Sequence, residues 1–141
     1  MSDSQTTASS GPRPLNILIV DDSAMMRMMI KRVASLCEVP IGNIYEASNG
    51  VEAIKVLEAN DIDALFTDIN MPVMTGTQLL REIGKYPRYH NLTRVIISTD
   101  GSSARREEVK DLNVRLYVEK PFRPEVMRDV LAEITTGAHV R

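Results

Sequence analysis

A chain of 141 residues with 43% hydrophobic and 26% charged side chains has the length and composition of one globular domain that buries its own core. The formal net charge of −2 gives no basic footprint for nucleic acid or a membrane surface, and no apolar run approaches the roughly 20 residues of a transmembrane helix. Cys37 is the single cysteine, which excludes an internal disulfide and a cysteine zinc cluster and leaves the cytoplasm as the expected location.

The first segment, residues 1–14, is rich in Ser, Thr, Gly and Pro and lacks the apolar core of a signal peptide. We expect it to be a disordered tail. The domain itself should occupy residues 15–136, and residues 137–141, which begin at Gly137, should form a short C-terminal tail.

Beyond the first tail, strand-like and helix-like segments alternate. We predict strands at 15–20, 43–47, 64–67, 94–98 and 116–118, and helices at about 23–37, 51–60, 76–85 and 104–112, with a fifth from Pro124 to about Ile134. Such alternation predicts an α/β fold, a doubly wound five-stranded parallel sheet with helices on both faces and right-handed crossovers.

Two of the predicted helices have distinctive apolar faces. In the first, Met25, Met29, Val33 and Leu36 recur at helical spacing, and we expect this stripe to face the core. The fourth, at 104–112, has the thinnest apolar face of the five, which predicts low local stability.

Polar residues follow the predicted strands where the strands end. Asp21 and Asp22 follow the first, Asp68 follows the third, Ser98 ends the fourth, and Lys120 follows the fifth. Because ligands of an open parallel sheet bind outside the carboxyl ends of its strands, we expect these side chains to converge on one rim.

Three carboxylates on one rim require a cation. Two unit charges at 4 Å repel by about 4 kcal/mol at an effective dielectric near 20. Oxygen ligands of this kind suit Mg²⁺, and one of the carboxylates could act as a nucleophile that forms an aspartyl phosphate. Taken singly, Asp22 could instead cap the first helix, and Lys120 could be a surface lysine. The specificity of the interpretation lies in all of them standing at the correct strand ends.

The segments ILIVDDSAMMRMMI, DALFTDINMPVMTG, VIIST and YVEKPF carry a family resemblance. Their order and spacing, from about residue 15 to residue 134, are similar to the receiver domain of two-component response regulators, and most closely to its single-domain chemotaxis members. The resemblance implies a flavodoxin-like strand order of 2-1-3-4-5.

The resemblance also implies a chemical role for each acidic residue. Asp68 matches the phosphorylated aspartate. Asp22 and Asp68 match direct ligands of Mg²⁺, for which Mn²⁺ can substitute, and the backbone carbonyl of Asn70 matches a third ligand. Asp21 matches an acid that acts through a metal-bound water.

The remaining matches concern switching. Ser98 matches the hydroxyl residue that senses the phosphoryl group, and Lys120 matches the lysine that pairs with it, with Lys120-Pro121 expected as a cis peptide bond. Tyr117 matches an aromatic switch residue. Two positions depart from the family pattern: Thr75 stands where an acidic residue is common, and Thr99 stands where Ala or Gly is usual, which bears on access to Asp68.

These features favour a phospho-signalling switch without separate substrate turnover. The expected partners are a histidine kinase, a downstream effector protein such as the flagellar motor switch, and a phosphatase. We expect no nucleic acid or membrane partner and a monomeric chain.

The alternative functions are a phosphorelay intermediate or phosphate sink, and an aspartate-nucleophile phosphatase. An enzyme of this last class carries D-x-D after its first strand, whereas here the acids are adjacent and Asp61-Ile62-Asp63 precedes its strand. A nucleotide-binding protein would need a P-loop or a G-x-G-x-x-G turn, and the sequence has neither.

Overall fold

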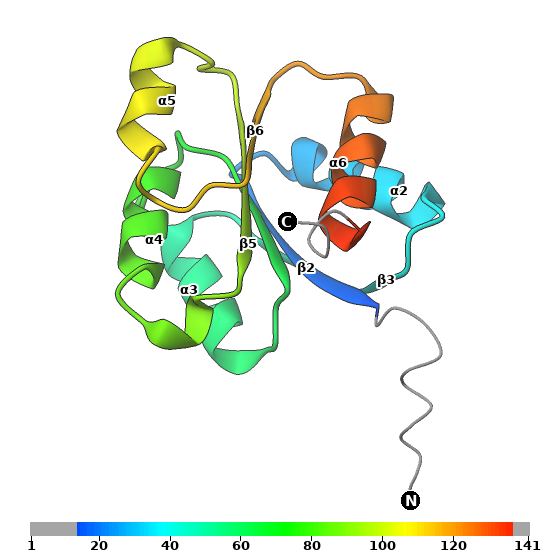
Figure 1. Ribbon diagram of the computed structural model, residues 1–141, viewed down its shortest axis with the longest axis horizontal. Helices are drawn as coiled ribbons and strands as arrows, with labels where there is room; N and C mark the ends of the chain where they lie inside the picture. The colour runs from blue at the N-terminus through cyan, green and yellow to red at the C-terminus, as the bar shows by residue number, and fades with distance from the viewer. Residues whose placement is uncertain (1–13, 137–141) are drawn as a thin grey trace, which may run out of the picture.

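One parallel sheet organises the computed structural model, which describes residues 14–136. The predicted tails, 1–14 and 137–141, lie outside the described residues except for Pro14. The strands are β2 (Leu15–Val20), β3 (Ile41–Ala47), β4 (Ala64–Thr67), β5 (Thr93–Ser98) and β6 (Leu116–Glu119). Their order across the sheet is β3-β2-β4-β5-β6, which is 2-1-3-4-5 in chain order, as predicted (Figure 1).

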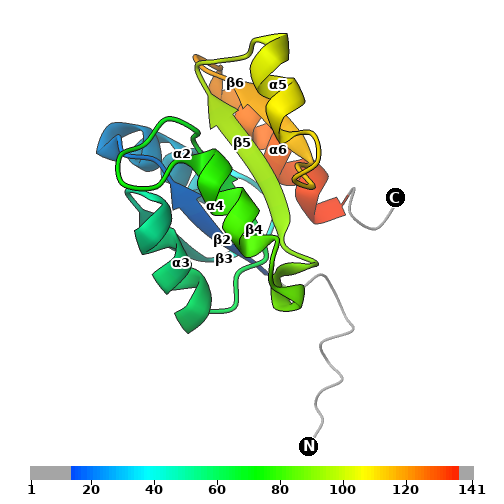
Figure 2. The same ribbon diagram turned by 90° about the vertical axis from the view of Figure 1, so that its left-hand side faces the viewer.

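Helices cover both faces of this sheet. They are α2 (Ala24–Leu36), α3 (Gly50–Ala59), α4 (Gly76–Ile83), α5 (Ser103–Val109) and α6 (Pro124–Thr136), with a short 3-10 helix, η2 (Pro87–Tyr89), before β5. Helices α2 and α6 lie on one face, and α3, α4 and α5 lie on the other (Figures 1 and 2). No helix within residues 14–136 is long and apolar enough to cross a bilayer.

Alternate residues of each central strand enter opposite cores. In β2, Leu18 and Val20 pack with α3 and α4, whereas Ile17 and Ile19 pack with α2 and α6. Strands buried on both faces read as continuous apolar runs, which is why the sequence predicted them well.

The buried stripe of α2 differs from the predicted one, of which Val33 does pack against the core. Met25 and Leu36 are 79% and 76% exposed, whereas Ile30 and Ala34 are buried against the sheet. Met26 packs against the same core from one turn earlier. Because the Met-rich segment offers apolar residues at two overlapping helical phases, periodicity alone could not select the phase that faces the sheet.

Several other elements differ from their predicted bounds by one to three residues. Strand β3 begins at Ile41, earlier than the predicted 43, and α4 ends at Ile83 rather than 85. Helix α5 ends at Val109 instead of 112, and Val109 is its one buried residue. The thin apolar face predicted for this helix is confirmed.

Candidate functional site

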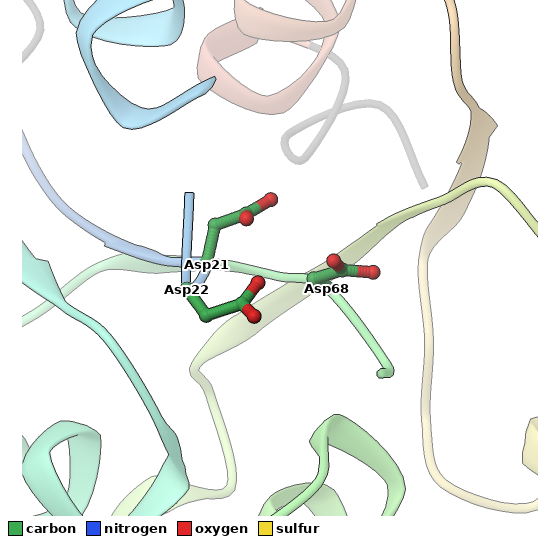
Figure 3. Close-up of side chains that lie close together, drawn as sticks. All are labelled: Asp21, Asp22 and Asp68. Carbon is green, nitrogen blue, oxygen red and sulfur yellow. The ribbon is translucent and has the colours of Figure 1, made fainter. Parts of the chain in front are cut away.

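The end of β2 places two aspartates in different environments. Asp21 is buried, and its Oδ1 accepts a hydrogen bond from the Ser23 backbone N–H at 2.9 Å. Asp22 is exposed. The N-cap of α2 is Ser23, whose hydroxyl accepts from the Met26 N–H at 3.2 Å. The helix-capping alternative for Asp22 is therefore wrong, and its carboxylate is left beside those of Asp21 and Asp68 (Figure 3).

Backbone contacts fix Asp68 beside the end of β2. Its N–H donates to the Val20 carbonyl at 2.9 Å, and its Oδ1 accepts from the Ile69 N–H at 2.7 Å. Helix α4 begins directly against this backbone, since a Cβ on Gly76 would lie 1.9 Å from the Asp68 carbonyl oxygen. Only glycine fits there. Thr75, a departure from the family pattern, serves as the N-cap of α4.

Lys120 links two of the carboxylates. Its Nζ lies 3.0 Å from Asp21 Oδ2 and 3.1 Å from Asp68 Oδ2, and the three side chains are 12%, 3% and 10% exposed, respectively. The Lys120 N–H donates to the Ser98 carbonyl at 2.8 Å, which holds the end of β6 against the end of β5. The Lys120-Pro121 peptide bond is cis, as expected. Lys120 is therefore not a surface lysine.

Negative charge exceeds positive charge among the side chains of this cluster, and the pKa values of two of them are shifted. Burial raises the pKa of Asp68 above its usual value, although the Lys120 ammonium and the Ile69 N–H act in the opposite direction. Burial alone would lower the pKa of Lys120, but Asp21 and Asp68 outweigh it and raise that pKa. The cluster thus contains three carboxylates and one lysine ammonium, which contacts two of them.

The donor set fits a hard divalent cation. Carboxylate oxygens of Asp21, Asp22 and Asp68 all lie within 4.8 Å of one another. Ligands across an octahedral Mg²⁺ at about 2.1 Å are about 4.2 Å apart, so small side-chain adjustments or one bridging water complete such a set. Asn70, exposed in the loop after Asp68, brings its backbone to the same end of the sheet.

Ser98 and Tyr117 are connected through one residue that the sequence did not single out. The buried Ser98 hydroxyl accepts from the Asp100 N–H at 3.1 Å, and the Tyr117 hydroxyl donates to the Asp100 carbonyl. The Arg106 guanidinium lies 4.4 Å from the centroid of the Tyr117 ring. Burial raises the pKa of Tyr117, while the Ser98 hydroxyl acts in the opposite direction. Thr99, between Ser98 and Asp100 in the chain, is exposed.

Comparisons with known proteins agree with this geometry. The sequence model of the response regulator receiver domain matches residues 17–132. A chemotaxis protein CheY homolog of Campylobacter jejuni is 33% identical over 121 residues, covering 85% of this chain and 92% of that protein. Chemotaxis protein CheY1 of Helicobacter pylori is 35% identical over 126 residues, covering 89% and 99%. The solved structure of the chemotaxis response regulator CheY4 of Vibrio cholerae superposes with a TM-score of 0.78 at 25% identity, covering 86% of this chain and 99% of that one.

Proposed function

The chain belongs to the response regulator receiver domain family of two-component signalling, and from this premise we propose that Asp68 accepts a phosphoryl group from a histidine kinase in a Mg²⁺-dependent reaction. The observation that carries the proposal is the convergence of Asp21, Asp22, Asp68 and Lys120 at the carboxyl ends of three strands. In this proposal the receiver domain comprises residues 15–136.

Asp68 is the nucleophile. A carboxylate oxygen attacks phosphorus, an O–P bond forms, and the N–P bond to the kinase imidazole breaks, so that the imidazole leaves with the bonding electron pair. The attack requires an ionised carboxylate. Lys120 opposes the burial that raises the pKa of Asp68, and it therefore maintains the reactive form.

The acidic cluster would hold the cation. Asp22, Asp68 and the Asn70 carbonyl are the direct protein ligands in this proposal, and Asp21 acts through a metal-bound water. When bound there, Mg²⁺, or Mn²⁺ in its place, would supply positive charge to neutralise the transferring phosphoryl group. The Lys120 ammonium, already positioned 3.1 Å from Asp68 Oδ2, pairs with a phosphoryl oxygen after transfer.

Ser98 and Tyr117 would couple phosphorylation of Asp68 to a conformational change at the protein surface. When the Ser98 hydroxyl turns to donate to the phosphoryl group, it gives up the hydrogen bond that it accepts from the Asp100 N–H. The Asp100 carbonyl holds the Tyr117 hydroxyl, so a shift of this residue moves the tyrosine and the start of α5. The output surface is then formed by α5, β6 and α6, and the segment 98–112 should change most.

The pathway that we propose is chemotaxis. The three similar proteins reported above are named as chemotaxis proteins, and this chain covers 92% to 99% of their lengths. An effector protein such as the flagellar motor switch would read the output surface of a monomeric chain, and a phosphatase would reset it. A phosphorelay intermediate or phosphate sink shares the same chemistry, and capture of partners by the phosphorylated chain separates these roles.

The experiment that tests the proposal measures phosphoryl incorporation from acetyl phosphate with Mg²⁺ and with EDTA. We expect incorporation to stop near one phosphoryl group per chain and to require the metal. Asp68→Asn should abolish it, whereas Asp61→Asn, an exposed acid of the D-x-D segment, should leave it unchanged. Hydrolysis of the donor without accumulation of any phosphorylated chain would indicate a phosphatase and overturn the switch.

A further inference from the structure

A cleft lined by both charged and apolar side chains lies at the opposite end of β5 from Ser98. It has a volume of about 720 Å³ and is bounded by the end of α4, by η2 and by the connection from α5 to β6. Arg94, near the start of β5, forms part of its wall, four residues before Ser98, which corresponds to about 13 Å along a strand. The cleft is therefore separate from the acidic cluster around Asp68.

Arg94 is an unusual residue for this position. It is only 4% exposed and pairs in register with Leu65 of the central strand β4. Its terminal nitrogens donate to the Leu92 carbonyl at 2.9 Å and the Tyr89 carbonyl at 3.1 Å. Its Nε is buried without an acceptor.

The charge of Arg94 has no counterion within the described part of the chain. No carboxylate of residues 14–136 forms an ion pair with it. Burial lowers the pKa of its guanidinium, but arginine remains protonated in proteins. Buried charges in native proteins are almost always paired, so an unpaired guanidinium at the wall of a cleft indicates that the counterion is supplied by a ligand.

Other side chains of the cleft strengthen its positive character. Arg81, in the last turn of α4, is exposed and makes no ion pair with a described residue, and Lys85 follows it along the wall. Lys85 is partly neutralised by Glu82 at 3.1 Å. Asp111 is the one acid of the lining, so the cleft is positive on a chain whose net charge is −2.

The remaining wall is apolar and sets the shape of the ligand. Leu80, Leu112 and the ring of Tyr86 line the cleft beside the cations. A volume of this size is typical of sites for small organic molecules, and a guanidinium forms its strongest hydrogen bonds with carboxylate and phosphate oxygens. The complementary molecule thus has an anionic head and a compact apolar body.

We propose that this cleft, with Arg94 and Arg81 as its anion-binding residues, is a ligand site for a small organic anion that carries a phosphate or a carboxylate. Binding here does not require phosphorylation of Asp68, although Asp111 and Leu112 of the lining belong to the segment 98–112 that should move when Asp68 is phosphorylated. Because the cleft joins the end of α4 to the turn that follows α5, an occupant would contact both.

The test uses the full chain, without Mg²⁺, titrated at constant ionic strength with phenyl phosphate and with benzoate while amide chemical shifts are recorded. We expect at least one of the two to give saturable shifts in residues 80–94 and 111–113. Saturation by phenyl phosphate alone identifies a phosphate ligand, and saturation by benzoate alone identifies a carboxylate.

Matched variants separate this site from general attraction to charge. Arg94→Met should weaken binding at least tenfold and Arg81→Gln at least threefold. Lys55→Gln, which removes an exposed cation of α3, and Asp68→Asn should leave the affinity unchanged. Arg81→Gln keeps the test decisive if Arg94→Met fails to fold, since Arg81 is exposed. Shifts that do not saturate, that sodium chloride reproduces, or that Lys55→Gln weakens as much as Arg81→Gln would overturn the proposal.

Discussion

Replacing Lys120 with methionine tests the electrostatics of the acidic cluster. Methionine keeps much of the apolar stem but removes the ammonium that lies 3.0 Å from Asp21 and 3.1 Å from Asp68. Removing one partner of a buried ion pair costs about 3–5 kcal/mol. The side chains of Lys120, Asp21 and Asp68 are 12%, 3% and 10% exposed, so solvent screening lowers this figure only slightly.

Protonation of Asp68 limits the loss. With an unfolded-state pKa of about 3.9, forcing one aspartate to be neutral at pH 7 costs at most about 4 kcal/mol. The Ile69 N–H still stabilises the carboxylate at 2.7 Å. We therefore expect Lys120→Met to lower the free energy of unfolding by about 3 kcal/mol at pH 7 without metal.

Urea unfolding in EDTA measures this loss, and its pH dependence identifies the cause. The folded-state pKa of Asp68 is raised by burial, so ionised Asp68 disfavours the folded state, and removal of Lys120 raises this pKa further. The difference in free energy of unfolding between the wild type and Lys120→Met should therefore decrease as the pH falls through the folded-state pKa of Asp68 toward about 4. Added Mg²⁺ should decrease this difference at pH 7.

The control is Lys110→Met, which breaks an exposed ion pair with Glu107 and should cost no more than about 0.5 kcal/mol. A loss below about 1 kcal/mol for Lys120→Met, or a loss that is the same at every pH, would refute the electrostatic reasoning and leave a packing effect.

Three further substitutions probe the neighbouring loops. Asp22→Asn should weaken Mg²⁺ binding in a metal titration and block phosphorylation, yet it should slightly stabilise the metal-free fold because it removes a like charge. Phosphorylation of this variant at the wild-type level would contradict the assignment of Asp22 as a metal ligand. Thr99→Ala should speed phosphorylation by small donors and shorten the lifetime of phosphorylated Asp68, each on the order of tenfold, and changes under twofold in both rates would exclude gating. Val73 is 79% exposed with φ 68°, in a tight turn in which the Met74 N–H donates to the Pro72 carbonyl at 2.7 Å. Since Asn tolerates this left-handed conformation better than a β-branched residue, Val73→Asn should raise the free energy of unfolding in urea by about 1 kcal/mol, and a loss would show that the turn carries no strain.

The sequence predicted the parts of the site that depend on strand ends. Because buried parallel strands are apolar along their whole length, the polar residues that follow each one mark the rim, and Asp21, Asp68 and Lys120 were found in this way. Tyr117 was identified only through the family resemblance, since an aromatic residue in a strand is ordinary.

The missed features depend on contacts that periodicity does not encode. The phase of α2 was ambiguous because both Met25 and Met26 are apolar, and packing against the sheet selected Met26. The link through Asp100 uses backbone atoms of a loop, and the unpaired Arg94 sits in a position where a strand residue is normally apolar. The loop contact has no local sequence signal, and the arginine is visible in the predicted strand, but the sequence does not tell whether its charge is paired.

Mapping the modified residue tests the central claim most directly. The chain would be treated with acetyl phosphate and Mg²⁺, the acyl phosphate trapped by borohydride reduction, and the modified peptide identified by mass spectrometry. We expect one modified residue, Asp68, with a bond that is labile to hydroxylamine and base before trapping. Phosphorylation that survives both treatments, or that persists in Asp68→Asn, would contradict the account.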